Sequence, residues 1–159
     1  MAFSRQDTEC MALALKLSKK GRASVGANPM VGCVITRDGK IVSQDYHRQY
    51  GKGHAEVNAL DQIKHQGKGA KLYVTLEPCS HQGKTPPCTK VLIKAGVKKA
   101  IVAMLDPNPM VSGRGVKLLK DAGIEVDIGL LQSEAMELNR GFIKRMETGM
   151  PFVTTKIAM

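Results

Sequence analysis

The chain alternates between two spacings of apolar residues, and each spacing predicts one kind of element. Apolar residues at every third or fourth position indicate helices, and short runs rich in β-branched residues indicate strands. Helices are predicted over residues 5–20, 54–64, 115–122 and 133–146. Strands are predicted over residues 31–36, 40–44, 71–76, 99–104 and 124–128. One more helix is expected to open at Pro86-Pro87-Cys88, because proline is tolerated in a first helical turn.

The order of these elements predicts a fold class. The first two strands are joined by Arg37-Asp38-Gly39-Lys40, and Asp-Gly between β-rich runs predicts a hairpin. From residue 71 onward strands and helices alternate, which favours a layered α/β sheet with helices on both faces. Ligands in such sheets bind beyond the carboxyl ends of strands, which is where the two Pro-Cys segments fall.

Composition narrows the class of protein. The 159 residues are enough for one domain with a proper core. No apolar run approaches the roughly 20 residues that span a bilayer, so no membrane partner is expected. The first residues lack an apolar signal-peptide core, and four cysteines are too few for a secreted disulfide framework. We therefore expect a cytoplasmic protein.

The net charge of +10 indicates an anionic partner without identifying it. Lysines and arginines are scattered along the chain, and only three Phe and three Tyr residues exist to stack on bases. A solvated basic surface is therefore favoured over a nucleic-acid track. A site for one phosphorylated metabolite would need only one or two of these cations.

Four residues carry the candidate chemistry. His54, Cys79 and Cys88 offer one imidazole and two thiolates, a ligand set that suits zinc. Glu56 lies two residues after the histidine and is left over as a proton shuttle. This ordered set of His-x-Glu, Glu-Pro-Cys and a second Pro-Cys matches the zinc deaminases of nucleobases. In that mechanism zinc lowers the pKa of its bound water from about 15.7 towards about 7.

Alternatives stay open for several of these residues. A structural zinc site is closed by a fourth protein ligand, for which His81 is the nearest candidate, whereas a catalytic site leaves that position to water. Glu56 has a second interpretation as a charge that complements its helix N-terminus. Glu77 is interpreted as a brace that holds its turn through backbone N–H groups. Cys10 and Cys33 fit a hydrophobic core better than a metal site.

Two stretches resemble one known family. Residues 54–60 (His-Ala-Glu-Val-Asn-Ala-Leu) and 75–88 (Thr-Leu-Glu-Pro-Cys-Ser-His-Gln-Gly-Lys-Thr-Pro-Pro-Cys) resemble the diaminohydroxyphosphoribosylaminopyrimidine deaminases of riboflavin biosynthesis. Residues 28–34 and 106–115 support the resemblance. Its most specific element is the run of eight residues between the cysteines, because nucleic-acid deaminases place these cysteines two residues apart. The resemblance implies a cytidine deaminase-like α/β fold, a three-layer α/β/α sandwich with a central mixed sheet of about five strands.

The resemblance also implies a reaction and its residues. The substrate would be 2,5-diamino-6-ribosylamino-4(3H)-pyrimidinone 5′-phosphate, whose 2-amino group is hydrolysed to a carbonyl with release of ammonia. One Zn²⁺ per chain would be bound by His54, Cys79 and Cys88, and Glu56 would be the catalytic residue. Lys84 would meet the phosphate, and the complete set of implied substrate contacts is Asn28, His47, His81, Lys84, Asp106 and Asn108. A homo-oligomer without a nucleic-acid partner is expected.

The function and two of the substrate contacts have alternative interpretations. The net charge motivates a nucleic-acid (tRNA) editing deaminase as an alternative function, and a closed zinc site would instead give a non-catalytic binding module. Asp106 and Asn108 need no ligand to explain them, because Asp-Pro-Asn-Pro is itself a strong turn signal.

The end of the chain departs from the pattern before it. A Gly/Pro link leads into a strand-like run, which is either an extra edge strand or the start of another domain. The run resembles the opening strand of the NADPH-dependent reductase that usually follows the deaminase in bacteria. We therefore expect a deaminase domain over residues 1–147, and a linker with an opening strand over residues 148–159. NADP would then belong to the absent reductase domain alone.

Overall fold

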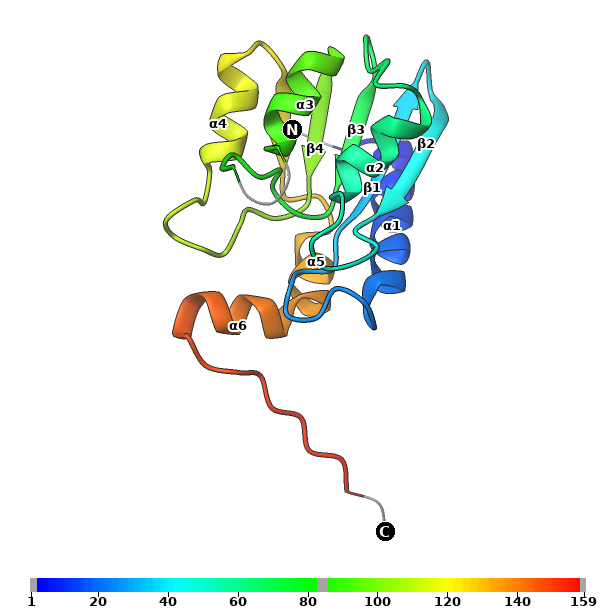
Figure 1. Ribbon diagram of the computed structural model, residues 1–159. Helices are drawn as coiled ribbons and strands as arrows, with labels where there is room; N and C mark the ends of the chain where they lie inside the picture. Colours follow the sequence, from blue (N-terminus) through cyan, green and yellow to red (C-terminus); the bar gives the residue numbers. More distant parts are fainter. Residues whose placement is uncertain (1–2, 83–85, 158–159) are drawn as a thin grey trace.

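The computed structural model describes residues 3–82 and 86–157 (Figure 1). Within these ranges the helices are α1 (Arg5–Ser18), α2 (Ala55–Gln62), α3 (Cys88–Ala95), α4 (Arg114–Asp121), α5 (Gln132–Leu138) and α6 (Arg140–Thr148), with a short 3-10 helix at Lys19–Gly21. The strands are β1 (Gly32–Arg37), β2 (Lys40–Tyr46), β3 (Lys71–Val74), β4 (Lys99–Val102) and β5 (Glu125–Ile128). Across this part of the chain, no helix combines the length and apolar character that crossing a membrane requires.

The described strands form one five-stranded mixed sheet in the order β2-β1-β3-β4-β5. β1 pairs antiparallel with both β2 and β3, whereas β3, β4 and β5 run parallel. The predicted hairpin is confirmed, since Asp38 and Gly39 have positive φ values and connect β1 to β2. Because β3 and β4 are parallel neighbours, the segments that follow them leave the same edge of the sheet.

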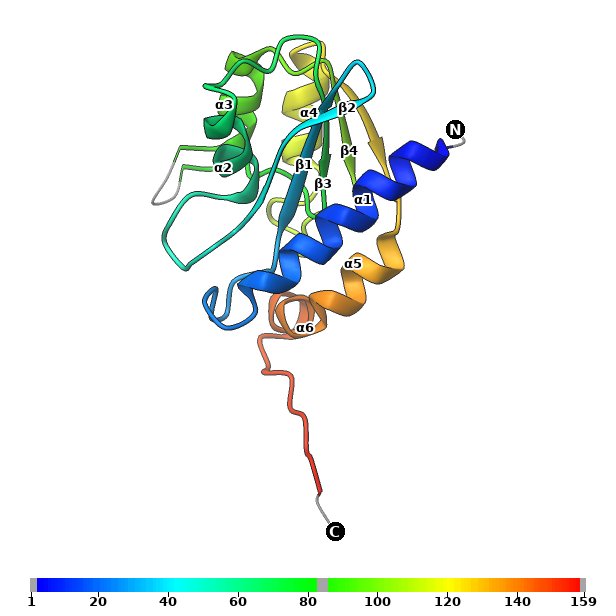
Figure 2. The same cartoon turned by 90° about the vertical axis from the view of Figure 1, so that its right-hand side faces the viewer.

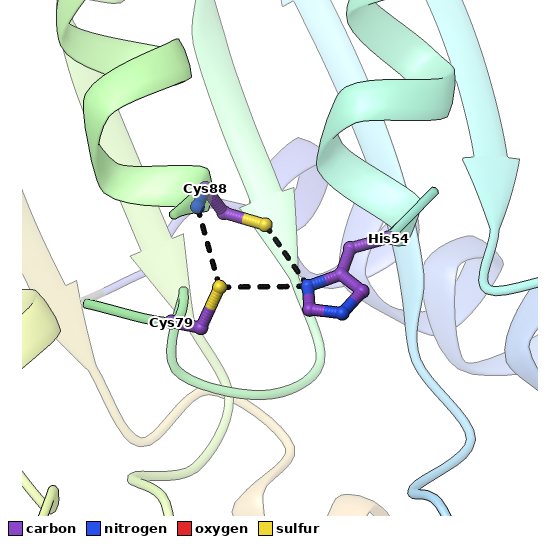
Figure 3. Close-up of side chains that lie close together, drawn as sticks. All are labelled: His54, Cys79 and Cys88. Carbon is purple, nitrogen blue, oxygen red and sulfur yellow. Dashed lines mark hydrogen bonds between the residues drawn. The ribbon is translucent and has the colours of Figure 1, made fainter. Parts of the chain in front are cut away.

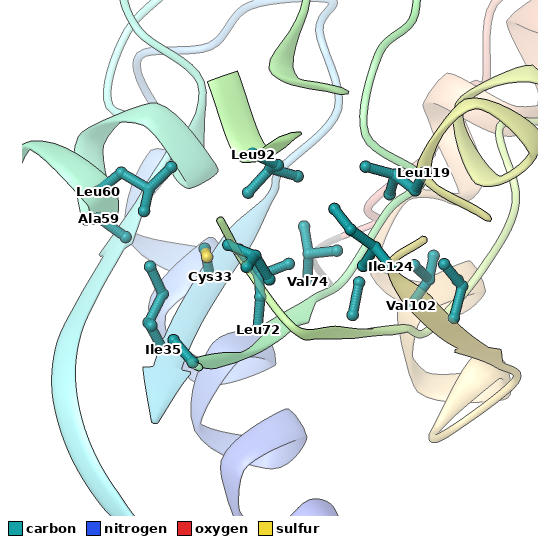
Figure 4. Packing of buried hydrophobic residues seen from close by; sticks show 14 of the residues in the cluster. Cys33, Ile35, Ala59, Leu60, Leu72, Val74, Leu92, Val102, Leu119 and Ile124 are labelled. Atoms are coloured by element: carbon teal, nitrogen blue, oxygen red, sulfur yellow. The ribbon is translucent and has the colours of Figure 1, made fainter. Parts of the chain in front are cut away.

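Alternate strand residues supply two separate cores, one on each face of the sheet. In β1, Cys33 and Ile35 belong to the first core and Val34 to the second. The first core packs under α2, α3 and α4 (Figure 4). The second packs under α1 and α5, which cover the other face, and against α6, which lies beyond the end of the sheet (Figure 2). The predicted three-layer α/β/α sandwich is therefore confirmed, and Cys10 and Cys33 are buried core residues as expected.

The predicted helix over residues 133–146 is wrong in one respect, because the structure divides it into α5 and α6 at Asn139. This residue leaves helical geometry (φ −108°, ψ 19°), and its buried side chain hydrogen-bonds the backbone of Met30. Ala135, Leu138 and Phe142 keep helical spacing across the break. Apolar periodicity therefore could not reveal it.

The strand-like run after α6 forms no strand in the described residues. Residues 151–157 are exposed and lie outside both helix and sheet, and the chain leaves the body of the protein there (Figure 1). The alternative of an extra edge strand is therefore wrong, because β-rich composition produces a strand only beside an available partner strand. The domain boundary at residue 148 stays a prediction.

A buried carboxylate ties α1 to the sheet. Asp7 forms a capping box with Ser4, and its Oδ1 accepts hydrogen bonds from the Tyr73 hydroxyl at 2.8 Å and from Lys71 Nζ at 3.0 Å. Burial by itself raises the pKa of Asp7, but the hydrogen bonds from Ser4, Lys71 and Tyr73 outweigh burial and lower the pKa well below its usual range. The ionised carboxylate therefore stabilises the fold.

We predict that Asp7→Asn lowers the free energy of unfolding at pH 7 by about 1.5–3 kcal/mol, the range for hydrogen bonds to a charged group. Because the folded-state pKa is lowered, this stabilisation is complete above the unfolded pKa of about 3.9 and is lost as the pH falls towards the folded pKa. Urea unfolding at pH 7 and pH 3 measures the effect. The gap between parent and variant should narrow at pH 3, and a gap that stays constant or widens would contradict the assignment.

Candidate active site

Three potential metal ligands converge beyond the carboxyl end of β3. The Nδ1 atom of His54 lies 3.2 Å from Sγ of Cys88 and 3.5 Å from Sγ of Cys79 (Figure 3). All three ligand atoms lie within 4.8 Å of one another. Sulfur and nitrogen ligands of a tetrahedral zinc ion stand roughly 3.5 Å apart, given bond lengths of about 2.3 Å and about 2.0–2.1 Å. The observed separations fit that geometry.

Local structure explains why these atoms meet. His54 is the extended residue immediately before α2 (φ −72°, ψ 163°), and Cys88 is the first residue of α3, directly after Pro87. Cys79 lies on the segment that follows β3. The backbone N–H of Cys88 donates a hydrogen bond to Sγ of Cys79 at 3.2 Å. Two helix N-termini therefore lie at the sulfur pair, and their partial positive charge favours thiolate.

The three side chains also adjust one another's protonation. A hydrogen bond from Cys88 lowers the pKa of Cys79, and hydrogen bonding to His54 adds to that effect. The same contact between the sulfurs raises the pKa of Cys88. Cys79 is therefore the thiol of the pair that loses its proton more readily. One imidazole with two sulfurs is a ligand set found in zinc sites.

No fourth protein ligand completes the group in the part of the chain that the structure describes. The group contains His54, Cys79 and Cys88, and His81 is an exposed residue outside it. An open fourth position is the feature that separates a catalytic zinc site from a structural one. The alternative of a module closed by His81 therefore has no support in the described residues.

Glu56 is buried beside the ligand group. It is the second residue of α2, is 3% exposed and lines the same cavity as His54. Burial raises the pKa of Glu56, and the nearby His54 opposes that shift. If Glu56 served only to complement the positive end of the α2 dipole, an exposed carboxylate would do so equally well, and burial would add only a cost of desolvation. A buried carboxyl with a raised pKa instead suits the exchange of protons near neutral pH.

A cavity of about 300 Å³ opens at this group and gathers most of the predicted substrate contacts. The predicted contacts that line it are Asn28, His47, His81, Asp106 and Asn108. Lys84, predicted to meet the phosphate, lies outside the described residues. The structure thus brings together segments that are far apart in the sequence.

His47 presents a hydrogen-bond acceptor inside the protein. Its ring is 4% exposed and stands edge-on to the ring of His54, with centroids 5.5 Å apart. Nδ1 lies 3.1 Å from the Gly53 carbonyl oxygen, which can only accept, so Nδ1 carries the hydrogen. Burial lowers the pKa of His47, which favours the neutral ring. Nε2 is then a buried acceptor with no partner among the described residues.

Glu77 braces the loop that follows β4. Its carboxylate accepts hydrogen bonds from the backbone N–H groups of Asp106 at 3.1 Å, Gly113 at 2.9 Å and Val116 at 3.1 Å. Glu77 is therefore a brace that acts through backbone N–H groups, as interpreted, but it holds the loop after β4 and not its own turn. The loop is thereby fixed against the segment that carries Cys79.

Asp106 and Asn108 form the predicted turn and also line the cavity. Oδ1 of Asp106 accepts the backbone N–H of Asn108 at 2.8 Å, and Oδ1 of Asn108 accepts that of Met110 at 3.0 Å. These are the hydrogen bonds of a turn. Both residues nevertheless line the cavity, so the turn presents them to it.

Helix α6 supplies part of the cavity wall that sequence reasoning missed. Phe142, Arg145 and Met146 line the cavity, and Nη2 of Arg145 donates a hydrogen bond to the Ala27 carbonyl at 2.8 Å. Arg145 is the one arginine or lysine among the described lining residues. No motif marks these positions, because they reach the cavity only through the packing of α6.

Comparison with known proteins is consistent with this site. Residues 4–104 match the family described as the cytidine and deoxycytidylate deaminase zinc-binding region. The matched range includes the ligand group and Glu56, and ends just after β4.

Individual relatives narrow the family further. The chain is 54% identical over 152 residues to the riboflavin biosynthesis protein RibD of Escherichia coli K12, covering 96% of this chain and 41% of that protein. It is 50% identical to the diaminohydroxyphosphoribosylamino-pyrimidine deaminase of Buchnera aphidicola subsp. Schizaphis graminum, covering 92% of this chain and 99% of that one. The solved structure of Acinetobacter baumannii RibD matches with a TM-score of 0.90 and 52% identity, over 93% of this chain and 42% of that chain.

The chain thus spans less than half the length of the RibD proteins it matches, and nearly the whole length of the Buchnera deaminase. It belongs to the zinc-binding cytidine and deoxycytidylate deaminase family, in the group of diaminohydroxyphosphoribosylaminopyrimidine deaminases of riboflavin biosynthesis.

Proposed function

We propose that this chain hydrolyses 2,5-diamino-6-ribosylamino-4(3H)-pyrimidinone 5′-phosphate to 5-amino-6-ribosylamino-2,4(1H,3H)-pyrimidinedione 5′-phosphate and ammonia, with one zinc ion per chain. The observation that carries the proposal is the open group of His54, Cys79 and Cys88, with buried Glu56 on the wall of the same cavity. The choice of substrate is supported by the similarity to the diaminohydroxyphosphoribosylamino-pyrimidine deaminase of Buchnera. A cytoplasmic homo-oligomer stays a prediction.

The ligand group would hold the metal through one nitrogen and two sulfurs. Two thiolates neutralise the charge of Zn²⁺, and His54 supplies the third ligand. Zinc bound there would supply Lewis acidity, which lowers the pKa of water towards about 7.

Glu56 would accept and donate the protons that the reaction transfers. Its carboxylate takes a proton from the attacking water as the new C–O bond forms at the carbon that bears the 2-amino group. The carboxyl then passes that proton to the ring nitrogen. Glu56 next takes the remaining proton from the new hydroxyl group and transfers it to the amine, so that the C–O bond becomes a carbonyl, the C–N bond breaks and ammonia leaves. One water is consumed and one ammonia is released. The raised pKa of Glu56 suits a group that must both accept and donate a proton.

The other lining residues would bind and orient the substrate. Nε2 of His47 would accept a hydrogen bond from a substrate N–H group, since it is the buried acceptor of a neutral ring. Asn28 and His81 would contact the substrate, and the loop braced by Glu77 would present Asp106 and Asn108 to it, while Lys84 would meet the phosphate. The cationic Arg145 on the cavity wall is compatible with an anionic substrate.

We predict that the purified protein contains about one zinc ion per chain, and that Cys79→Ser and Cys88→Ser each lose it. Metal binding is coupled to folding, so loss of thermal stability should accompany loss of metal. Cys10→Ser is the matched control, because Cys10 is a buried cysteine of α1 that belongs to the hydrophobic core and not to the ligand group. Elemental analysis measures the metal content, and full zinc occupancy in both ligand variants would refute the assignment.

Replacement of Glu56 by Gln should keep zinc and fold but lower the rate of ammonia release by about 10²–10⁴-fold, because an amide cannot shuttle protons. The matched control is Asp61→Asn, which changes an exposed carboxylate on the same helix. Steady-state assays of both variants give the comparison. A Glu56→Gln rate within a few-fold of the parent would leave Glu56 as no more than a helix-terminal charge.

The reaction itself is tested by incubating the zinc-loaded protein with the diaminopyrimidinone phosphate and following ammonia release. Single-stranded RNA and DNA oligonucleotides serve as competing substrates, and editing them would show affinity that falls steeply with salt. We expect ammonia from the pyrimidine and none from the oligonucleotides. Deamination of oligonucleotides alone would replace the proposed function with an editing one.

A further inference from the structure

Asn139 joins two segments that are distant in the sequence. Its Oδ1 accepts a hydrogen bond from the backbone N–H of Met30 at 2.8 Å, and its Nδ2 donates one to the carbonyl of the same residue at 3.0 Å. The residue is 3% exposed. One amide therefore satisfies both backbone groups of Met30 across 109 residues of chain.

The role of Asn139 is not explained by the helix that it precedes. Asparagine before a helix normally uses its side chain to cap the first backbone N–H groups. Asn139 makes no such capping hydrogen bond to α6, while its own N–H is bonded to the carbonyls of Ala135 and Met136. The corner between α5 and α6 is thus formed by backbone hydrogen bonds, and the side chain of Asn139 bonds only to Met30 among the described residues.

The segment that Asn139 holds is part of the cavity wall. Asn28, Pro29 and Val31 all line the cavity, on either side of Met30. The carbonyl of Val31 accepts the backbone N–H of His47 at 2.9 Å, which fixes the other end of this segment. The position of Asn28 in the cavity therefore depends on how Met30 is held.

We propose that Asn139 is a positioning residue, which acts through the backbone of Met30 to hold Asn28 against the substrate. The proposal rests on the proposed function, in which Asn28 contacts the pyrimidine nucleotide. It assigns a role in substrate fit to the corner between α5 and α6, which lies outside residues 4–104 matched by the zinc-binding family. Among the described residues, the hydrogen bonds of Asn139 go to Met30, Ala135, Met136 and Ile143, not to a metal ligand or Glu56, so we expect zinc binding and proton transfer to be independent of this corner.

Two variants test the proposal by steady-state kinetics. Asn139→Leu keeps much of the side-chain volume but removes both hydrogen bonds, and Asn139→Ala removes the volume as well. Each should raise KM on the order of tenfold or more, as expected when buried backbone groups lose their partners, while kcat changes less than about threefold. Zinc content should stay at the parent level.

Asp7→Asn is the control for a general loss of stability. Asp7 contacts Lys71 at the start of β3, whereas the ligand group lies beyond the other end of that strand. This variant should be less stable and yet keep the parent KM. Equal rises of KM in Asp7→Asn and Asn139→Leu, or parallel losses of kcat and zinc in Asn139→Leu, would show a merely structural role and overturn the proposal.

A second readout does not depend on activity. Hydrogen–deuterium exchange of the zinc-loaded protein should show faster exchange at the Met30 amide in Asn139→Leu, on the order of tenfold, with β3 amides unchanged. If the parent releases no ammonia, the proposed function fails, and a faster Met30 amide still supports the positioning contact. An unchanged Met30 amide overturns the inference whatever the activity.

Discussion

The candidate metal site depends on one constraint: one imidazole nitrogen and two sulfurs must come together from segments up to 34 residues apart. Their separations of 3.2 and 3.5 Å leave little tolerance, because zinc bond lengths vary by only about 0.2 Å. Rigid elements set these positions: His54 immediately precedes α2, α3 begins at Cys88, and Cys79 follows the buried strand β3. The sheet and its two cores hold the starts of these helices beside the end of that strand.

The chemistry of the site could be predicted from sequence because it uses local rules. Ligand types and spacing identified His54, Cys79 and Cys88, and the Asp-Gly hairpin and the strand–helix alternation predicted the sheet. A bracing role for Glu77 could be proposed from its place beside a turn, but its partners Asp106, Gly113 and Val116 lie on a distant loop and could not be predicted.

What sequence reasoning missed depends on contacts between distant segments. The residues around Asn139 keep helical spacing, and neither the backbone turn that divides the helix there nor the pairing of the Asn139 side chain with Met30 is marked by that spacing. Phe142 and Arg145 reach the cavity because α6 packs against the segment around Ala27. The cavity therefore has two parts: the range shared with the deaminase family holds the ligands and Glu56, and the later loop and α6 complete the wall.

X-ray absorption at the zinc edge tests the central claim, an open zinc site built from one histidine and two cysteines. The account predicts two sulfur ligands at about 2.3 Å, one imidazole nitrogen at about 2.0–2.1 Å, and one oxygen in the fourth position. A second imidazole or a third sulfur in the first coordination shell would mean that the protein closes the site, and would contradict a catalytic role for the metal.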